Sequence, residues 1–184
     1  MNAYLRSPLF FMQVNLKSFR LKVRHHKSRL KRFLSKIELK PPRNLFATLT
    51  KIDKEVWKET DCLSCANCCK TMTPTYTEKD MKRISKHFNM TVDAFKKKWL
   101  KKDKVGDWLN KHVPCQFLDN ETNKCSIYAI RPDDCKSFPH LTKKKVTDYI
   151  HVHKANLDSC PATYKMVEKL IESVNSSQSA VSSR

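Results

Sequence analysis

Eight cysteines, all between residues 62 and 160, limit what this 184-residue chain can fold into more than any other feature. The stretch "DCLSCANCCK" (61–70) contains four of them and the other four are dispersed, so the full set is Cys62, Cys65, Cys68, Cys69, Cys115, Cys125, Cys135 and Cys160. Thiolate sulfur suits zinc, iron and iron–sulfur clusters, and such sites need about four ligands from separate segments. The pattern therefore favours metal binding.

The choice between metal ligands and disulfides depends on the redox compartment. No stretch approaches the roughly 18 apolar residues of a membrane-spanning helix, so we expect no transmembrane segment. The short apolar run "PLFFMQV" (8–14) contains Gln13 and has no small-residue cleavage site, which argues against a secretory signal. We therefore expect a cytoplasmic protein, in which thiols stay reduced and CxxC spacings indicate metal rather than disulfides.

The adjacent pair Cys68 and Cys69 restricts how the ligands are shared. If residues 62–69 are helical or tightly turned, Cys62, Cys65 and Cys68 lie roughly on one side, and Cys69 points about 100° away from Cys68. One ion would have difficulty binding both neighbours, whereas a multi-iron cluster or two nearby metals accommodates them. Eight thiols could complete two mononuclear sites, or one cluster and one zinc.

The N-terminal part of the chain is strongly basic. Residues 1–37 contain no acidic residue, and apolar side chains recur with helical spacing at Leu16, Phe19, Val23, Leu30, Phe33 and Ile37. The predicted basic amphipathic helix, with the net charge of +19, indicates a polyanion, an anionic membrane surface or an acidic protein as partner of residues 13–43. A solvated helix packed on the domain and an organelle transit peptide are the alternatives.

We expect a mainly α fold: a small metal-nucleated domain with irregular loops, preceded by the basic amphipathic helix. The predicted divisions are the N-terminal extension 1–43, which Pro41 and Pro42 end, the cysteine-cluster metal-binding domain 44–174, and a disordered tail 175–184. Lysine-rich stretches 96–107 and 140–154 are predicted loops between ligand sites.

Apolar spacing and capping residues place the other helices. A second helix follows from the stripe Leu45, Leu49, Ile52 and Val56. Thr77 and Asp80 have the form of a capping box before the stripe Met81, Ile84 and Phe88, and Thr91 is a predicted N-cap before Val92, Phe95 and Trp99. Pro161 begins a final helix that we expect to run to about Ser173.

The cysteine blocks carry a family resemblance. The pattern CxxCxxCC, CxFL and CxIYxxRPxxCxxFP over roughly residues 55–165 resembles the YkgJ-type cysteine-cluster family, which is described as a zinc- or iron-chelating domain and also as an iron–sulfur-cluster protein. One departure is Ala66, where many members have glycine after the second cysteine. The resemblance implies metal binding through the cysteines, but the family's general biochemical role is poorly defined.

Other side chains near the cysteines are weaker candidates. Tyr128 and Arg131 could donate hydrogen bonds to metal-bound sulfur or bind an anionic ligand, and a packed turn held by Pro132 is an equal alternative. His140, His151 and His153 offer imidazole ligands, although exposed loop histidines are the commoner case.

Two functions fit these observations. The first is a zinc/iron-chelating or iron–sulfur-cluster protein, with a possible redox link and an unknown redox partner; enzymatic activity and catalytic residues are not assigned. The alternative is a nucleic-acid-binding module in which zinc is purely structural. Gly106 is the only glycine, so a glycine-rich phosphate loop cannot be built and nucleotide-dependent chemistry is disfavoured.

Overall fold

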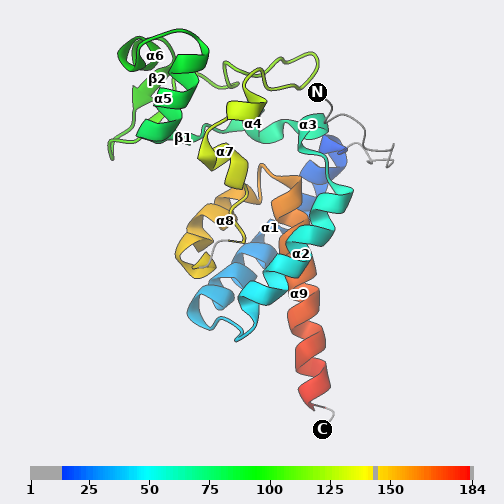
Figure 1. The fold of residues 1–184 in the computed structure, drawn as a ribbon. Coiled ribbons are helices and arrows are strands. Elements are labelled where there is room, and N and C mark those ends of the chain that lie inside the picture. Colours follow the sequence, from blue (N-terminus) through cyan, green and yellow to red (C-terminus); the bar gives the residue numbers. More distant parts are fainter. Residues whose placement is uncertain (1–13, 143–144, 183–184) are drawn as a thin grey trace, which may run out of the picture. The chain divides into compact units, whose positions relative to one another are not determined.

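The computed structural model describes residues 14–142 and 145–182, so the apolar run at 8–14 lies almost entirely outside the described residues. The fold is mainly helical with one small sheet, as expected (Figure 1). Two compact units are present: unit 1 comprises Met1–Cys65 and His140–Arg184, and unit 2 comprises Ala66–Pro139. In the described part of the chain, no helix is long and apolar enough to cross a membrane.

Unit 1 is a group of helices. Its elements are α1 (Leu16–Leu39), α2 (Leu45–Glu59), α3 (Cys62–Cys65), the 3-10 helix η2 (Val146–Tyr149), α8 (Ile150–Asn156) and α9 (Pro161–Ser182). Helix α9 contacts both α1 and α2, and α1 also contacts α8 (Figure 1). The α2 stripe Leu45, Leu49, Ile52 and Val56 is buried, which confirms that part of the predicted pattern.

Helix α1 differs from its prediction in one core position. Asn15 caps its start, since the side chain accepts a hydrogen bond from the Ser18 N–H at 3.0 Å, and the helix ends at Leu39 before the two prolines. Phe19, Val23, Leu30, Leu34 and Ile37 are buried. Leu34 therefore takes the place predicted for Phe33, which is only partly buried, because the period of 3.6 residues brings Leu30, Leu34 and Ile37 onto one face.

Unit 1 contains helices in two segments that were expected to lack them. The predicted loop 140–154 contains η2 and most of α8, whose Ile150 and His153 are buried at helical spacing. Helix α9 continues to Ser182, where composition had indicated a disordered tail from residue 175, because no glycine or proline interrupts the helix after Pro161. The predicted domain limits at residues 43 and 174 stay predictions.

Unit 2 surrounds a three-stranded antiparallel sheet. It contains α4 (Asn67–Thr71), β1 (Thr75–Tyr76), α5 (Glu78–His87), α6 (Val92–Trp99), β2 (Leu100–Lys102), β3 (Trp108–Asn110), the 3-10 helix η1 (Tyr128–Ile130) and α7 (Asp133–Ser137). The strand order is β1-β3-β2, with Tyr76 opposite Trp108 and Leu100 opposite Asn110. The predicted loop 96–107 thus contains the end of α6, all of β2 and the turn before β3.

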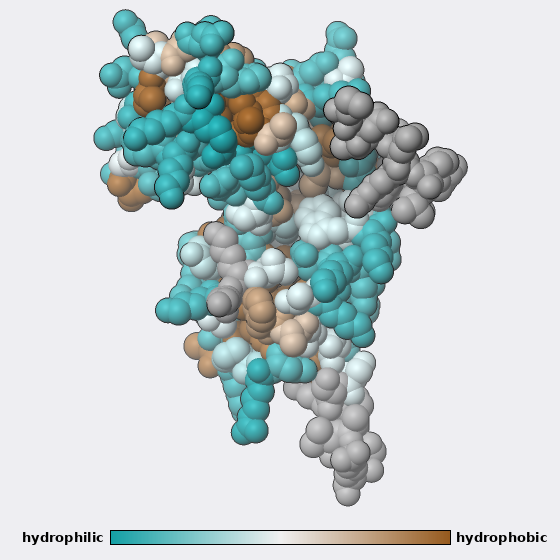
Figure 2. Space-filling model, in the orientation of Figure 1, coloured by the Kyte–Doolittle hydropathy of each residue, from teal (hydrophilic) through white to brown (hydrophobic). Residues whose placement is uncertain are grey.

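The core of unit 2 is aromatic and aliphatic. Its buried residues are Tyr76, Met81, Ile84, Phe95, Leu100, Phe117 and Ile127. The rings of Phe95 and Phe117 are nearly parallel with centroids 6.5 Å apart, and Trp99 closes one side at 5.4 Å from Phe117. Helices α5 and α6 begin at the predicted caps, Thr77 and Thr91. Hydrophilic side chains make up most of the described surface on the face drawn in Figure 2.

Candidate metal centre

The CxxCxxCC motif folds as two short helices joined by a left-handed residue. Cys62 and Cys65 begin and end α3, Ala66 has φ 46° and ψ 15°, and α4 carries Cys68 and Cys69. The motif is therefore helical and tightly turned, which was the condition assumed for the directions of its cysteines. The boundary between the two units falls between Cys65 and Ala66, so the cysteines belong to two separate groups.

Unit 2 brings four thiols together: Cys69, Cys115, Cys125 and Cys135, named here the four-thiol group. Burial raises the pKa of Cys135 far above its ordinary value, and the thiolate charges of Cys69, Cys115 and Cys125 raise it further. Burial also raises the pKa of Cys115 and of Cys125, and the Cys69 charge adds to both. Since the Cys125 charge also raises the pKa of Cys115, every pair in the group interacts electrostatically.

Cys69 is the most acidic member of the four-thiol group. A hydrogen bond from Cys68 lowers the pKa of Cys69 to about 7, against the opposing effect of burial and with help from backbone hydrogen bonding and the Lys70 charge. A thiol with a pKa of about 7 is roughly half ionised at neutral pH, and the thiolate is the form that binds metal. Ionisation of any of the other three thiols would place a second negative charge near Cys69, so a cation among the four would favour their thiolate forms.

Backbone hydrogen bonds hold the loop that carries Cys115 and Cys125. The Cys115 N–H donates to the Cys69 carbonyl at 2.8 Å, which ties the loop to α4. Leu118 and Cys125 pair as an isolated antiparallel bridge, and the Ser126 N–H donates to the Phe117 carbonyl at 2.8 Å. Phe117 lies in the aromatic core, so the core fixes the loop between the two cysteines.

Polar side chains from the sheet face the four-thiol group. The Tyr76 hydroxyl donates to Asn110 Oδ1 at 2.6 Å, and Gln116 Nε2 donates to the same oxygen at 2.9 Å. Burial raises the pKa of Tyr76 far above its usual range, with further contributions from the charges of Cys115, Cys135 and Cys125. Asn110 interacts with the Cys115 thiol and lowers its pKa, although burial outweighs this effect. An amide donor beside a thiolate is a common support of a thiolate-bound metal.

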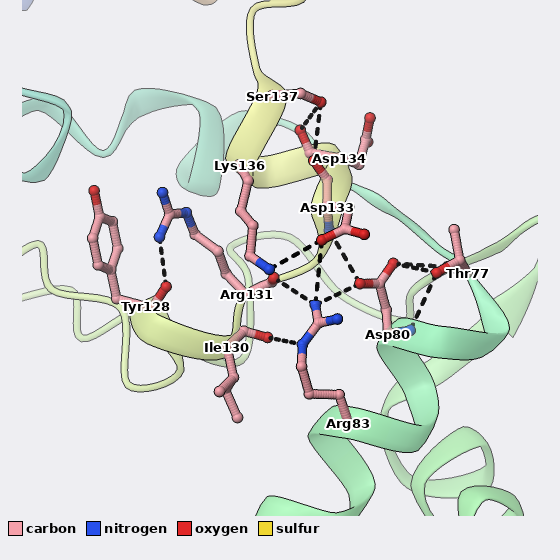
Figure 3. A network of polar contacts seen from close by, with 10 residues as sticks. All are labelled: Thr77, Asp80, Arg83, Tyr128, Ile130, Arg131, Asp133, Asp134, Lys136 and Ser137. Atoms are coloured by element: carbon pink, nitrogen blue, oxygen red, sulfur yellow. Dashed lines mark hydrogen bonds and ion pairs between the residues drawn. The ribbon is translucent and has the colours of Figure 1, made fainter.

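A buried carboxylate positions the segment that carries Cys135 (Figure 3). Asp80 Oδ2 accepts hydrogen bonds from the Thr77 N–H and hydroxyl, and Asp80 Oδ1 accepts from Arg83 Nη2 at 2.6 Å and from the Asp133 N–H at 3.1 Å. Arg83 also donates to the Arg131 carbonyl at 3.0 Å. Asp134 accepts from the Thr75 N–H at 3.0 Å, so α5 and β1 both hold α7.

The remaining thiols lie in unit 1, except Cys68. Burial raises the pKa of Cys160, and the Cys65 charge also raises it, which places these two buried thiols close together. Cys160 Sγ accepts a hydrogen bond from the Thr163 N–H at 3.4 Å at the start of α9. Cys62 lies three residues before Cys65 on α3 and is exposed. None of the eight cysteines, all of which lie in the described part of the chain, is joined in a disulfide.

The other predicted candidates are the pair Tyr128 and Arg131 and three histidines. The Arg131 guanidinium stacks on the Tyr128 ring at 3.9 Å and donates to the Tyr128 carbonyl at 2.6 Å, while its charge partly offsets the rise in the pKa of Cys125 that burial causes. Their roles beside a metal stay predictions. His140 is buried in a loop, His153 is buried on α8, and His151 is exposed on α8, so the interpretation of these histidines as exposed loop residues was wrong.

Sequence reasoning missed Asn110, Tyr76 and Asp80 as neighbours of the cysteines. Only the capping-box pattern pointed to Asp80, and nothing near Asn110 in the sequence indicates a thiol neighbour. Within residues 14–142 and 145–182, no three His, Cys, Asp or Glu side chains already converge closely enough to hold a metal ion. The four thiols are therefore neighbours whose side chains would have to turn toward a bound ion.

Comparisons with known proteins support metal chelation by this part of the chain. Residues 61–161 match the family model CxxCxxCC, described as "Putative zinc- or iron-chelating domain". An uncharacterized protein of Methanocaldococcus jannaschii is 32% identical over 81 residues, which is 43% of each chain, so this chain matches less than half of that relative. No solved structure matches. Because the family model covers more than half of the sequence, the chain belongs to the CxxCxxCC family of zinc- or iron-chelating domains.

Proposed function

We propose that the four-thiol group of unit 2 holds one metal centre, either a zinc or iron ion or an iron–sulfur cluster. The observation that supports this best is the mutual electrostatic interaction of every pair among Cys69, Cys115, Cys125 and Cys135. Four thiolates complete a tetrahedral zinc site and equally suit an iron–sulfur cluster. The family membership supports metal binding and leaves the kind of metal open.

The surrounding residues fit such a centre. Cys68 hydrogen-bonds Cys69 and need not be a ligand, which removes the difficulty that two adjacent cysteines pose for a single ion. Asn110 and Tyr76 cover the group from the sheet, and the Asp80 network holds Cys135. A bound iron–sulfur cluster would supply one-electron transfer, whereas a bound zinc ion would supply structural stability.

Cys62, Cys65 and Cys160 form a second candidate set in unit 1. The electrostatic interaction between Cys65 and Cys160 supports their proximity, and Cys62 lies one helical turn from Cys65. We propose that these thiols are also metal ligands, as the complete cysteine pattern predicts. We also propose that Tyr128 and Arg131 lie next to the metal centre, because the Arg131 charge acts on the pKa of Cys125.

Metal content and optical absorption test the proposal. Protein purified without oxygen should contain zinc or iron in a fixed ratio to the chain, and iron with sulfide should give visible absorption bands. Cys115→Ser and Cys135→Ser should each remove metal from the four-thiol group, while the exposed control His151→Ala should leave it unchanged. Retention of all metal by both serine variants would contradict the assignment.

The same measurement separates the two functions. Iron with sulfide supports an iron–sulfur centre and a redox link, whereas zinc alone supports a structural role and the nucleic-acid-binding alternative. The cytoplasm is the proposed location, because its reducing conditions keep cysteines as thiols that can bind metal, and none of the eight is in a disulfide.

A further inference from the structure

The outer face of α1 is a dense array of cations. This helix of 24 residues carries nine Lys and Arg and a single acid, Glu38. Glu38 is paired with Lys154 of α8 at 3.1 Å, so the only acid of α1 is already neutralised. Lys27 and Lys31 pair with Asp158 at 2.7 and 3.6 Å. Those two lysines therefore help to hold α1 on unit 1.

Seven cations of α1 stay at the surface. They are all exposed, and none forms an ion pair with any residue that the structure describes: Lys17, Arg20, Lys22, Arg24, Arg29, Arg32 and Lys36. Uncompensated like charges three or four residues apart on one helix repel each other and weaken the helix. Binding of a polyanion would turn this repulsion into attraction.

The apolar face of α1 is not available to a lipid bilayer. Phe19, Val23, Leu30, Leu34 and Ile37 are buried against the rest of unit 1, and the Phe19 ring meets the Tyr164 ring edge-on at 6.0 Å. An amphipathic helix binds a membrane surface by inserting such a face among the acyl chains. Any partner of the outer face must therefore be recognised by charge and shape.

The cations lie along two flanks of the exposed face. Lys22, Arg29 and Lys36 are spaced by seven residues, so they form a row with steps of roughly 10.5 Å. Lys17 and Arg24 have the same spacing on the opposite flank, and Arg32 lies between the two rows. A helix is about 10–12 Å wide with its side chains. The major groove of duplex DNA is about 12 Å wide, and phosphates border it on both sides.

We propose that the outer face of α1 binds duplex DNA, with its two rows of cations on the phosphates that border one major groove. The deep, narrow major groove of duplex RNA would not admit the helix. Contacts to phosphates carry no sequence information, so the binding we infer is independent of base sequence. It rests on unit 1 alone and does not require the proposed metal centre.

Point substitutions test this better than deletion, because removing α1 would expose the apolar surfaces of α8 and α9. The test variant is Lys22→Gln/Arg29→Gln/Lys36→Gln in the full chain. The matched control, Lys97→Gln/Lys101→Gln/Lys104→Gln, removes three exposed charges from unit 2. A second variant, Lys22→Arg/Lys36→Arg, keeps the row charged. The unfolding temperature and metal content of each variant show that fold and metal are retained.

The probe is a 20-base-pair duplex DNA of random sequence, titrated at several salt concentrations. Each phosphate contact contributes about −0.9 to the slope of log affinity against log salt, so the test variant should lose about 2.7 of that slope. The control and the arginine variant should stay close to the unsubstituted protein. Duplex RNA and vesicles containing phosphatidylserine should bind more weakly than the DNA at equal salt.

Three results would overturn the proposal. Equal weakening by the test variant and the control would mean that net charge alone attracts the DNA. An unchanged slope in the test variant would show that α1 does not touch the phosphates. Tighter α1-dependent binding to the RNA or to the vesicles would identify a different partner.

Discussion

At the scale of single residues, Asp80 does most to connect secondary structure with the candidate centre. Its carboxylate is fully buried, caps α5 through Thr77, and binds Arg83 and the Asp133 N–H two residues before Cys135. Burial by itself would raise the pKa of Asp80, but hydrogen bonds from Thr77, Arg83 and Asp133 outweigh it, so the pKa lies below its ordinary value. The ionised form is therefore the one that the fold stabilises.

Asp80→Asn should destabilise unit 2 by about 2–4 kcal/mol, because the amide cannot satisfy all the donors and leaves Arg83 without its closest charge partner. Urea unfolding followed by tryptophan fluorescence measures the change, and the exposed Glu121→Gln serves as control. The pKa of Asp80 is lowered by folding, so its contribution is complete above about pH 4, the unfolded value, and is lost as the pH falls through the folded value.

The pH dependence of the unfolding free energy is a second test of the role of Asp80. Unfolding free energies at pH 6 and pH 3 should differ more in the unsubstituted protein than in Asp80→Asn, which has no carboxylate to protonate at this position. An equal pH dependence in both proteins would show that other carboxylates dominate the acid response.

At the scale of secondary structure elements, α1 has two faces with different roles. The inner face packs on α8 and α9 with Leu34 almost completely buried, whereas Leu21 on the outer face is 53% exposed. The same residue type thus occurs in both environments on one helix. This contrast allows packing to be tested at constant chemistry.

Leu34→Ala should lower the unfolding free energy of the protein by about 2–5 kcal/mol, because it removes buried methyl groups and leaves a cavity between α1 and its neighbours. Leu21→Ala should change it by less than about 0.5 kcal/mol, as exposed substitutions usually do. Thermal or urea unfolding of both variants compares the two directly. Similar losses in both would mean that α1 is not packed on unit 1 as described.

At the scale of the whole molecule, we expect the two units to depend on metal to different degrees. The four-thiol group lies entirely within unit 2, where only Phe117 and Ile127 of the segment between Cys115 and Cys135 are buried members of the core cluster. Unit 1 has a helical core of its own formed by α1, α2, α8 and α9. Structural zinc contributes on the order of 10–16 kcal/mol in small domains, which is comparable with the stability of a whole domain.

Removal of metal by a chelator should therefore abolish the amide protection of unit 2 more completely than that of unit 1. Hydrogen exchange read by mass spectrometry resolves the two, with peptides from α5 and α6 exchanging fast and peptides from α1 and α2 remaining protected. Loss of protection in both units together would show that the cysteines of unit 1 also need metal to fold.

Structural features that depend on neighbours within one or two helical turns could be predicted from the sequence alone. The stripes of α2 and α5 and the caps at Thr77 and Thr91 follow from local spacing, and the cysteine pattern predicted a metal-chelating domain. Even Ala66, the one departure from the family's glycine, proved to be a left-handed residue, the conformation that glycine adopts at the lowest cost.

Which thiols lie near one another depends on the tertiary structure. Cys69, Cys115, Cys125 and Cys135 come together because a buried aromatic core, a sheet and the Asp80 network fix loops that are distant in the chain. Cys65 and Cys160 fall in the other unit although Cys65 is only four residues from Cys69. Local periodicity contains no information on such pairings, because burial and long-range hydrogen bonds select them after the helices have formed.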